Sequence, residues 1–196
     1  AITGRTRSLS RSPHSGSQSS TRKDNSMGVR VAARYLSVEA FGPFGEIAQV
    51  SSGTPPNLKG PTWNCWYPIA RIPGSLPLLL GLVETGPLSG EVTLMERHEG
   101  RVEVVIALDR PILQVVAPAT TRLRRPMAKT VRAFVVRPGE SVILAPGTWH
   151  AAAATADDNV SRYLFGLPES SDSDVDSGWT TIDGGAVAVD LAVRNL

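Results

Sequence analysis

Hydrophobic positions come in short runs that are separated by glycine, proline or clusters of polar residues. The runs have the length of β-strands, and they favour β-branched and aromatic residues. A single helical turn is predicted over residues 37–41, with Ser37 as its N-cap. The predicted strands cover residues 29–36, 44–50, 63–72, 76–83, 91–98, 102–108, 112–116, 130–136, 141–144 and 160–167. Residues 186–193 are predicted to form a closing strand or a short helix. Many short strands without a long helix predict an all-β sandwich or barrel.

The first 26 residues differ from the rest of the chain. They are rich in serine, arginine and glycine and hold almost no residues that could form a core. Such a composition does not offset the entropy of ordering, so we expect 1–26 to be a disordered basic tail or leader. Residues 27–196 are long enough for one domain with a sizeable core.

The charge is unevenly distributed between these two parts. The tail carries five basic residues and one acidic residue, whereas the remainder carries 15 basic and 17 acidic residues. The basic sequence pI of about 9.0 therefore comes from the tail, and the mildly acidic domain is no phosphate-binding surface. We expect neither nucleic acid nor a membrane as a partner, because no apolar run approaches the ~20 residues that a membrane span needs. A single cysteine, Cys65, excludes an internal disulfide framework and agrees with a reducing, cytoplasmic location.

Two short stretches carry the candidate chemistry, residues 96–103 (ERHEGRVE) and residues 139–150 (GESVILAPGTWH). Outside the tail, His98 and His150 are the only histidines of the sequence. Glu99-Gly100 has the composition of a hairpin turn. We therefore expect the strands that carry His98 and Glu103 to be neighbours and to bring both side chains to one mouth of the domain.

Histidine nitrogens and carboxylate oxygens together suit a divalent first-row metal ion, and such a set leaves positions open for substrate. Two histidines and two glutamates, Glu96 and Glu103, occur here at close spacing. Buried carboxylates are rare unless they are paired or bound to metal. The alternative is a pair of hydrogen-bonded histidines in a β-core without a catalytic role.

The spacing Glu96-x-His98-x4-Glu103 followed by Gly-x2-His150 resembles the two metal-binding motifs of the cupin superfamily, with Glu96 in place of the first histidine. From Met27 onward the chain resembles more specifically the ureidoglycolate lyase family of one-domain cupins. Three stretches carry this resemblance: residues 31–50 (VAARYLSVEAFGPFGEIAQV), 95–111 (MERHEGRVEVVIALDRP) and 131–153 (VRAFVVRPGESVILAPGTWHAAA).

The chain departs from the family pattern at positions near the candidate site. Glu103 stands where the family has glutamine, Ile143-Leu144 replace an Asn-Tyr pair, and Ala151 replaces a second histidine. The losses remove polar groups that could hold a ureido substrate, and the change to Glu103 brings the motif closer to the general metal-cupin pattern.

The resemblance implies a cupin-like β-barrel or jelly-roll sandwich and a lyase that converts ureidoglycolate to glyoxylate and urea in allantoin and purine degradation. It implies a small carboxylate substrate and a homodimer. A divalent ion, nickel, manganese or zinc, would be held by His98, Glu103 and His150. Glu96 would be the fourth ligand or the proton carrier, so that Glu96, Glu103 and His150 form the catalytic set.

Three further residues are candidates for substrate binding. Arg97 and Arg101 compete as the clamp for the substrate carboxylate, because guanidinium binds carboxylate through two parallel hydrogen bonds. Strand alternation turns Arg97 away from Glu96 and His98, so a surface ion pair is its alternative role. Trp149, next to His150, is predicted to line the pocket.

Two other functions remain open from the sequence. The apolar residues Ile143, Leu144 and Ala151 favour another metal-dependent cupin enzyme, an isomerase or oxygenase. A non-catalytic module that binds a small molecule is the third hypothesis, in which the His/Glu set has lost its role.

Overall fold

The computed structural model describes residues 28–50, 52–62, 64–73, 77–88, 90–119, 124–169 and 178–191. The predicted tail, residues 1–26, lies outside these ranges. Within them, no helix has the length and apolar content that crossing a bilayer would require.

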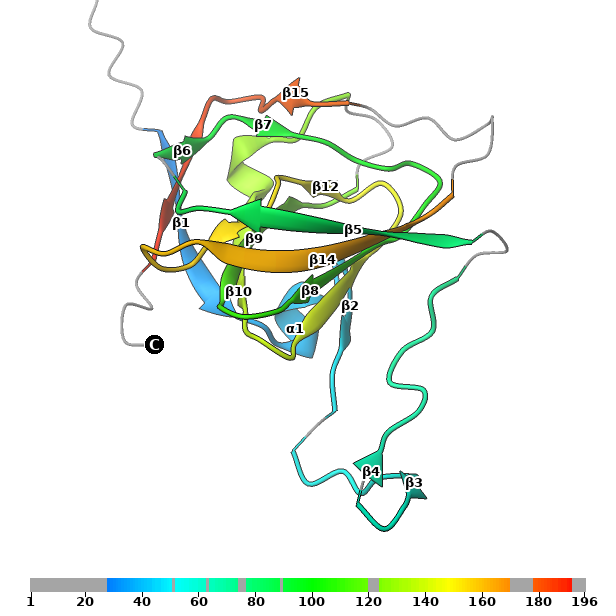
Figure 1. Cartoon of the computed structure of the whole chain (residues 1–196). Helices are drawn as coiled ribbons and strands as arrows, with labels where there is room; N and C mark the ends of the chain where they lie inside the picture. The colour runs from blue at the N-terminus through cyan, green and yellow to red at the C-terminus, as the bar shows by residue number, and fades with distance from the viewer. Residues whose placement is uncertain are drawn as a thin grey trace, which may run out of the picture.

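The larger of the two main sheets has seven strands in the order β12-β9-β10-β1-β16-β6, with β13 also paired to β9 (Figure 1). Most neighbours are antiparallel, whereas β1 runs parallel to both β10 and β16. Its strands are β1 (Val29–Tyr35), β6 (Glu91–Val92), β9 (Ile112–Ala117), β10 (Arg132–Val136), β12 (Trp149–His150), β13 (Ala154–Thr155) and β16 (Val187–Asp190).

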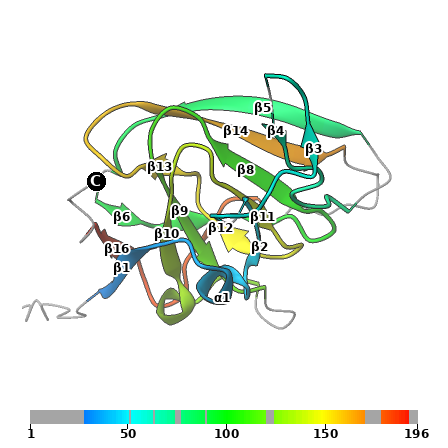
Figure 2. The same cartoon turned by 90° about the horizontal axis from the view of Figure 1, so that it is seen from below.

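The second main sheet has five antiparallel strands in the order β2-β11-β8-β14-β5 (Figure 2). Both edges of β8 are paired, one with β11 and the other with β14. Its strands are β2 (Gly45–Ala48), β5 (Leu78–Thr85), β8 (Glu103–Ala107), β11 (Ser141–Leu144) and β14 (Ser161–Pro168).

Short elements complete the described structure. The pairs are β7 (Leu94–Met95) with β15 (Thr180–Thr181), and β3 (Leu58–Lys59) with β4 (Asn64–Cys65). The 3-10 helix η1 covers Ala128–Thr130 and the helical turn α1 covers Val38–Phe41. The backbone amide of Ala40 donates to Ser37 Oγ at 3.2 Å, which confirms the predicted N-cap.

The two main sheets enclose an apolar core. One cluster lies between them and includes Phe41, Phe134 and Tyr163, with the rings of Phe41 and Phe134 packed edge to face at 5.2 Å between centroids. A second cluster lies on the other face of the seven-stranded sheet and includes Trp149 and Met95. Residues of β9 alternate between the two clusters, so this strand is buried along its whole length. The all-β prediction is confirmed.

Two sequence predictions about individual strands are wrong in detail, and one that was left open is decided. Of the strand predicted over 63–72, only the two residues of β4 pair, because Pro68 has no N–H to donate to a ladder. The predicted strand 91–98 is divided into β6 and β7, which belong to different sheets. Residues 186–193, left open between strand and helix, contain the strand β16.

The predicted hairpin around Glu99-Gly100 is also wrong. The chain bends at these residues, but it passes from β7, paired with β15, to β8 in the five-stranded sheet. Because β11 and β14 already occupy both edges of β8, the segment that carries His98 has no free edge to pair with. The bend therefore crosses between sheets.

The outer face of the edge strand β5 is apolar. Leu80 and Leu82 are 65% and 61% exposed, although they lie on the same strand as the cavity-lining Val83. The homodimer expected from the family resemblance stays a prediction.

Candidate metal centre and its cavity

Glu96 and His98 lie just after β7, two residues apart in extended chain. Residues two apart in extended chain point to the same face, so both side chains point inward. The backbone of Glu96 forms a closed pair with His150: each amide donates to the other residue's carbonyl at 2.9 Å. Residues opposite each other in an antiparallel pair project to the same side. This bridge therefore brings His150 onto the face that carries Glu96 and His98.

His150 is delivered by the turn that precedes β12. Gly147 has φ +77°, a left-handed conformation that glycine adopts without strain, and its amide donates to the His98 carbonyl at 2.8 Å. The turn is closed by the Thr148 amide, which donates to Ala145 O at 3.0 Å. The same turn thus fixes the backbone on both sides of the site, at His98 and at His150.

The second ring nitrogen of His150 has its own partner. Nδ1 lies 3.2 Å from the carbonyl oxygen of Thr148. When Nδ1 carries the proton and donates it to that carbonyl, Nε2 presents its lone pair to the centre of the site. Such a backbone contact is typical of histidines that bind metal ions.

Glu103 reaches the same point from the other sheet, as the first residue of β8. Its Oε2 lies 2.8 Å from His150 Nε2 and 3.4 Å from His98 Nε2. Glu96 Oε1 lies 3.8 Å from His150 Nε2. Ligands bound at ~2.1 Å to one ion lie roughly 3.0–3.4 Å apart in octahedral or tetrahedral geometry. The four side chains are therefore close to the separations that a shared ion requires.

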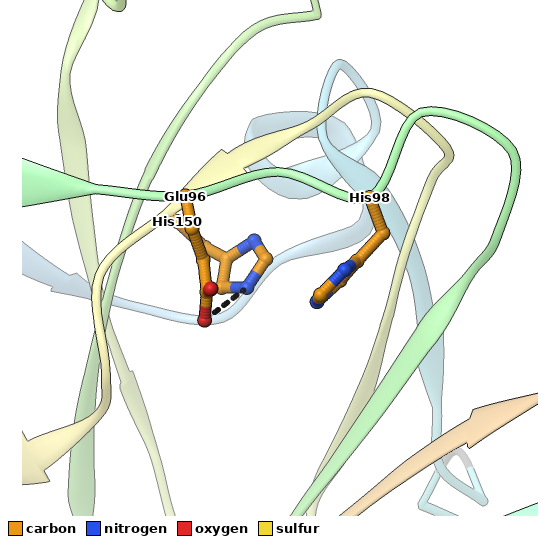
Figure 3. A group of neighbouring side chains, drawn as sticks. All are labelled: Glu96, His98 and His150. Carbon is orange, nitrogen blue, oxygen red and sulfur yellow. Dashed lines mark ion pairs between the residues drawn. The ribbon is translucent and has the colours of Figure 1, made fainter. Parts of the chain in front are cut away.

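The two imidazoles face each other across the site, with ring centroids 5.3 Å apart (Figure 3). One donor atom each from Glu96, His98 and His150 lies within 4.8 Å of the others, so these three residues could hold a metal ion. The structure places these three side chains and Glu103 close together, although the strands that bring them there are paired differently from the prediction.

Burial and the two histidines act in opposite directions on Glu103. Burial raises the pKa of the carboxyl, but the hydrogen-bonding contacts and charges of His150 and His98 outweigh it and lower the pKa to about 2. The carboxylate is only 9% exposed as a residue and remains ionised at neutral pH. A carboxylate that stays ionised is the form that binds a metal ion.

The site lies in a cavity of about 400 Å³ between the sheets. That volume suits a small organic acid. Apolar side chains form much of the wall, and Trp179, which is 51% exposed, lies at the cavity as well. The lining residues are Val83, Glu96, His98, Glu103, Val105, Gln114, Ala151, Ala152, Ala153, His150, Tyr163, Phe165, Leu167 and Trp179.

The residues predicted to bind substrate lie elsewhere among the described residues. Trp149 is fully buried in the core cluster on the opposite face of β12 from His150. Arg97 pairs with Glu99, and its guanidinium carbon stacks 4.5 Å from the Trp149 ring. Arg101 donates to the carbonyl of Pro168 at 3.0 Å. None of the three lines the cavity. Alternation turns Arg97 and Trp149 away from Glu96, His98 and His150, whereas Arg101 lies after the bend at Glu99-Gly100 and its guanidinium contacts Pro168.

Two polar residues of the cavity were missed from the sequence, Gln114 on β9 and Tyr163 on β14. Both lie inside apolar strand runs, ILQVVA and SRYLFGLP, where a single polar or amphipathic side chain looks like part of the core. The available signal was Gln114 itself, since an uncharged polar residue in a wholly apolar strand needs a partner.

The comparison with protein families shows the family of this chain. A family model described as ureidoglycolate lyase matches residues 29–182, which include every residue of the candidate metal centre. The chain belongs to the ureidoglycolate lyase family. The resemblance to this family is thereby confirmed, and the structure has the all-β architecture of packed sheets that was expected.

The individual proteins that resemble this chain share little sequence identity with it. A ureidoglycolate lyase of Chelativorans sp. (strain BNC1) is 25% identical over 138 residues, which cover 62% of this chain and 74% of that protein. A dTDP sugar isomerase structure from Desulfovibrio desulfuricans G20 overlaps with TM-score 0.39 and 12% identity, covering 68% of this chain and 84% of that one. An oxalate decarboxylase from Lactobacillus farciminis overlaps with TM-score 0.37 and 15% identity, over 67% of this chain and 30% of that one.

Proposed function

We propose that the protein cleaves ureidoglycolate to glyoxylate and urea, a reaction of allantoin degradation. The observation that carries the proposal is the convergence of two imidazoles and two carboxylates at one cavity of a ureidoglycolate lyase family member. The cavity of about 400 Å³ accommodates a substrate of this size together with an ion.

The donor set fits a divalent first-row metal ion. His98, His150 and Glu103 would hold it, with Glu96 as a fourth ligand or as the proton carrier, because two nitrogens and carboxylate oxygens suit nickel, manganese and zinc alike. When bound, such an ion supplies Lewis-acid polarisation of the substrate's hydroxyl and carboxylate oxygens.

The protein's own contribution to the reaction is proton transfer. Cleavage requires the carbinol hydroxyl to lose its proton and form the carbonyl of glyoxylate, while the breaking C–N bond leaves its electron pair on nitrogen, which takes up a proton. Glu96 is suited to move that proton. Its side chain is 25% exposed, compared with 11% for Glu103, and it lies beside His150 at the cavity. A positioned acid/base of this kind contributes on the order of 10²–10⁴-fold.

Glu103 has a different role in this mechanism. Without a bound ion, its contacts with the two imidazoles lower its pKa to about 2, so it is an anion at neutral pH and a weak base. It orients His98 and His150 and contributes negative charge to the ligand set. Apolar wall residues such as Val105 and Phe165 keep bulk water from the breaking bond.

The test is direct product analysis. The full chain is incubated with ureidoglycolate and with added nickel, manganese or zinc, and glyoxylate and urea are measured separately. The proposal expects the two products in equal amounts, at a rate well above the spontaneous decay of the substrate.

Matched glutamate variants assign the proton carrier. Glu96→Gln should lower kcat by about 10²–10⁴-fold, while Glu46→Gln, an exposed strand glutamate outside the cavity, should leave kcat unchanged. Release of ammonia in place of urea, or no acceleration with any of the three ions, would contradict the proposed reaction.

A further inference from the structure

The cavity contains a buried amide that the proposed reaction has not yet used. Gln114 is only 1% exposed and lies on β9, where Ile112 and Val116 face the same side. Within the described residues its one hydrogen bond runs from Nε2 to the carbonyl of Ala151 at 3.1 Å. A carboxamide has two N–H donors and an acceptor oxygen, so one N–H and Oε1 are left for a molecule in the cavity.

A phenol lies on the facing sheet. Tyr163 of β14 is 6% exposed and lines the same cavity. Burial and the negative charge of Glu103 raise its pKa to about 12, although the backbone amide of Ala153 acts in the opposite direction. Any phenol is protonated at neutral pH, so the hydroxyl of Tyr163 can donate a hydrogen bond into the cavity.

Gln114 and Tyr163 flank one segment, residues 151–153, which also lines the cavity. Gln114 contacts the carbonyl of Ala151, and the hydroxyl of Tyr163 faces the amide of Ala153. The register places His150 opposite Val116, two residues along β9 from Gln114. Two residues of strand span about 6.6 Å, which matches the length of a small ureido acid.

We propose that Gln114 and Tyr163 recognise the ureido group of the substrate and determine the specificity of the cavity. This inference rests on the proposed function, since it places the carboxylate and hydroxyl ends at Glu96, His98, Glu103 and His150. Gln114 Oε1 accepts a hydrogen bond from the terminal NH₂ of the ureido group. The hydroxyl of Tyr163 donates to the ureido carbonyl oxygen.

The donors and acceptors of Gln114 and Tyr163 complement those of a ureido group. A ureido group offers a carbonyl acceptor beside N–H donors, and the pair offers a hydroxyl donor beside an amide oxygen. Buried polar groups that are built to hydrogen-bond a substrate discriminate strongly against analogues that leave them unpaired. The pair thus supplies polar groups on a wall that is otherwise largely apolar, with Val83, Val105 and Ala151 among its residues.

Two stable analogues separate recognition from turnover. N-carbamoylglycine carries the ureido and carboxylate groups but has no hydroxyl, so it cannot be cleaved. N-acetylglycine replaces its terminal NH₂ by a methyl group and keeps the carbonyl. Their dissociation constants are measured by calorimetry on the full chain with the same added ion as in the activity assay, alongside kcat/KM for ureidoglycolate.

The two variants should give different patterns. Gln114→Leu, which keeps the side-chain size, should weaken N-carbamoylglycine by about 10- to 100-fold and leave N-acetylglycine within about threefold. Tyr163→Phe should weaken both analogues to a similar degree, because both carry the carbonyl. Gln49→Leu and Tyr35→Phe, which lie outside the cavity, should change neither constant.

The outcomes distinguish the inference from the proposed function. If the wild-type chain cleaves ureidoglycolate but Gln114→Leu weakens both analogues equally, or neither, the specificity assignment is overturned and the reaction stands. If the wild-type chain binds N-carbamoylglycine in a Gln114-dependent way but releases no urea, the reaction fails and the recognition stands. Failure of the wild-type chain to bind N-carbamoylglycine overturns the inference.

Discussion

The two ends of the cavity are built in different ways. The donor end, made of Glu96, His98, Glu103 and His150, comes from the two-residue strand β12, from the chain after β7 and from the first position of β8. The strand wall, made of Gln114 and Tyr163, comes from the middle of the long strands β9 and β14. The donor end depends on turns and crossings for its geometry, whereas the strand wall depends only on strand alternation and register.

The difference predicts how each end responds to change. Side chains of the donor end converge on one point, so removing one of them affects all the others. Side chains of the strand wall contact different atoms of a substrate, so their effects should be smaller and specific to a substrate group.

The largest effect should come from the donor end. His98→Ala or His150→Ala should lower kcat/KM for ureidoglycolate by more than about 10²-fold, because even outer-shell partners of metal ligands cost 10–100-fold. Steady-state glyoxylate assays measure the loss, and near-UV circular dichroism checks that the fold is retained. His14→Ala, the third histidine of the sequence, is the matched control and should be fully active. Full activity of either site variant would remove the donor end from catalysis.

Removing the metal ion should abolish turnover but lower the melting temperature only modestly. The two largest apolar clusters of the described residues do not depend on the donor end, so chelation should only remove the linkage contribution, RT ln(1 + [L]/Kd). At a hundredfold excess over Kd this is about 2.7 kcal/mol, or several degrees of melting temperature by calorimetry. His98→Ala should show no shift on chelation. Loss of the whole transition on chelation would show instead that the ion holds the fold together.

A substitution at Trp149 tests whether this residue contributes to stability or to substrate binding. The sequence predicted it at the pocket, whereas the structure buries it in a core cluster. Trp149→Phe should lower the free energy of unfolding by roughly 1–3 kcal/mol through lost packing. It should leave KM within about twofold, because the ring lies on the opposite face of β12 from His150. Denaturant unfolding and steady-state kinetics measure the two quantities. A large rise in KM with unchanged stability would restore the binding role.

The smallest effect should appear at high pH. The sequence has three tyrosines, and Tyr163 has its pKa raised to about 12 by burial and by the charge of Glu103. Because the folded pKa lies above the ordinary value of ~10, its contribution to stability is present below pH 10 and is lost as the pH rises through about 12. Absorbance near 295 nm should show one tyrosine that titrates late, and Tyr163→Phe should remove only that phase. Titration of Tyr163 near pH 10 would show that its environment is more open than the structure indicates.

The sequence predicts the donor end well because its signals are local. His98 and His150 are the only histidines outside the tail, and Glu96 and Glu103 lie within five residues of His98. Gly147 marks the turn before His150 through its need for a left-handed conformation. Most strands were also predicted within a few residues, because apolar runs bounded by glycine and proline are local as well.

Strand pairing is a long-range property, and it was predicted less well. Glu99-Gly100 has the composition of a hairpin turn, yet the occupied edges of β8 force the chain to cross between sheets. Arg97 and Trp149 are immediate sequence neighbours of Glu96, His98 and His150, but alternation turns them to the opposite face. Gln114 and Tyr163 could be found only from the packing of one sheet against the other, because nothing next to them in the chain indicates a cavity.

The contact between Glu103 and His150 joins the two main sheets at 2.8 Å, since one residue lies on β8 and the other on β12. The two sheets cannot separate at this point without moving the buried carboxylate of Glu103 away from the imidazole of His150. Opening of the sandwich is therefore a poor route for molecules that enter or leave the cavity. Substrate and products should instead enter and leave beside the chain outside the main sheets, where Trp179 is half-exposed and lines the cavity next to β15.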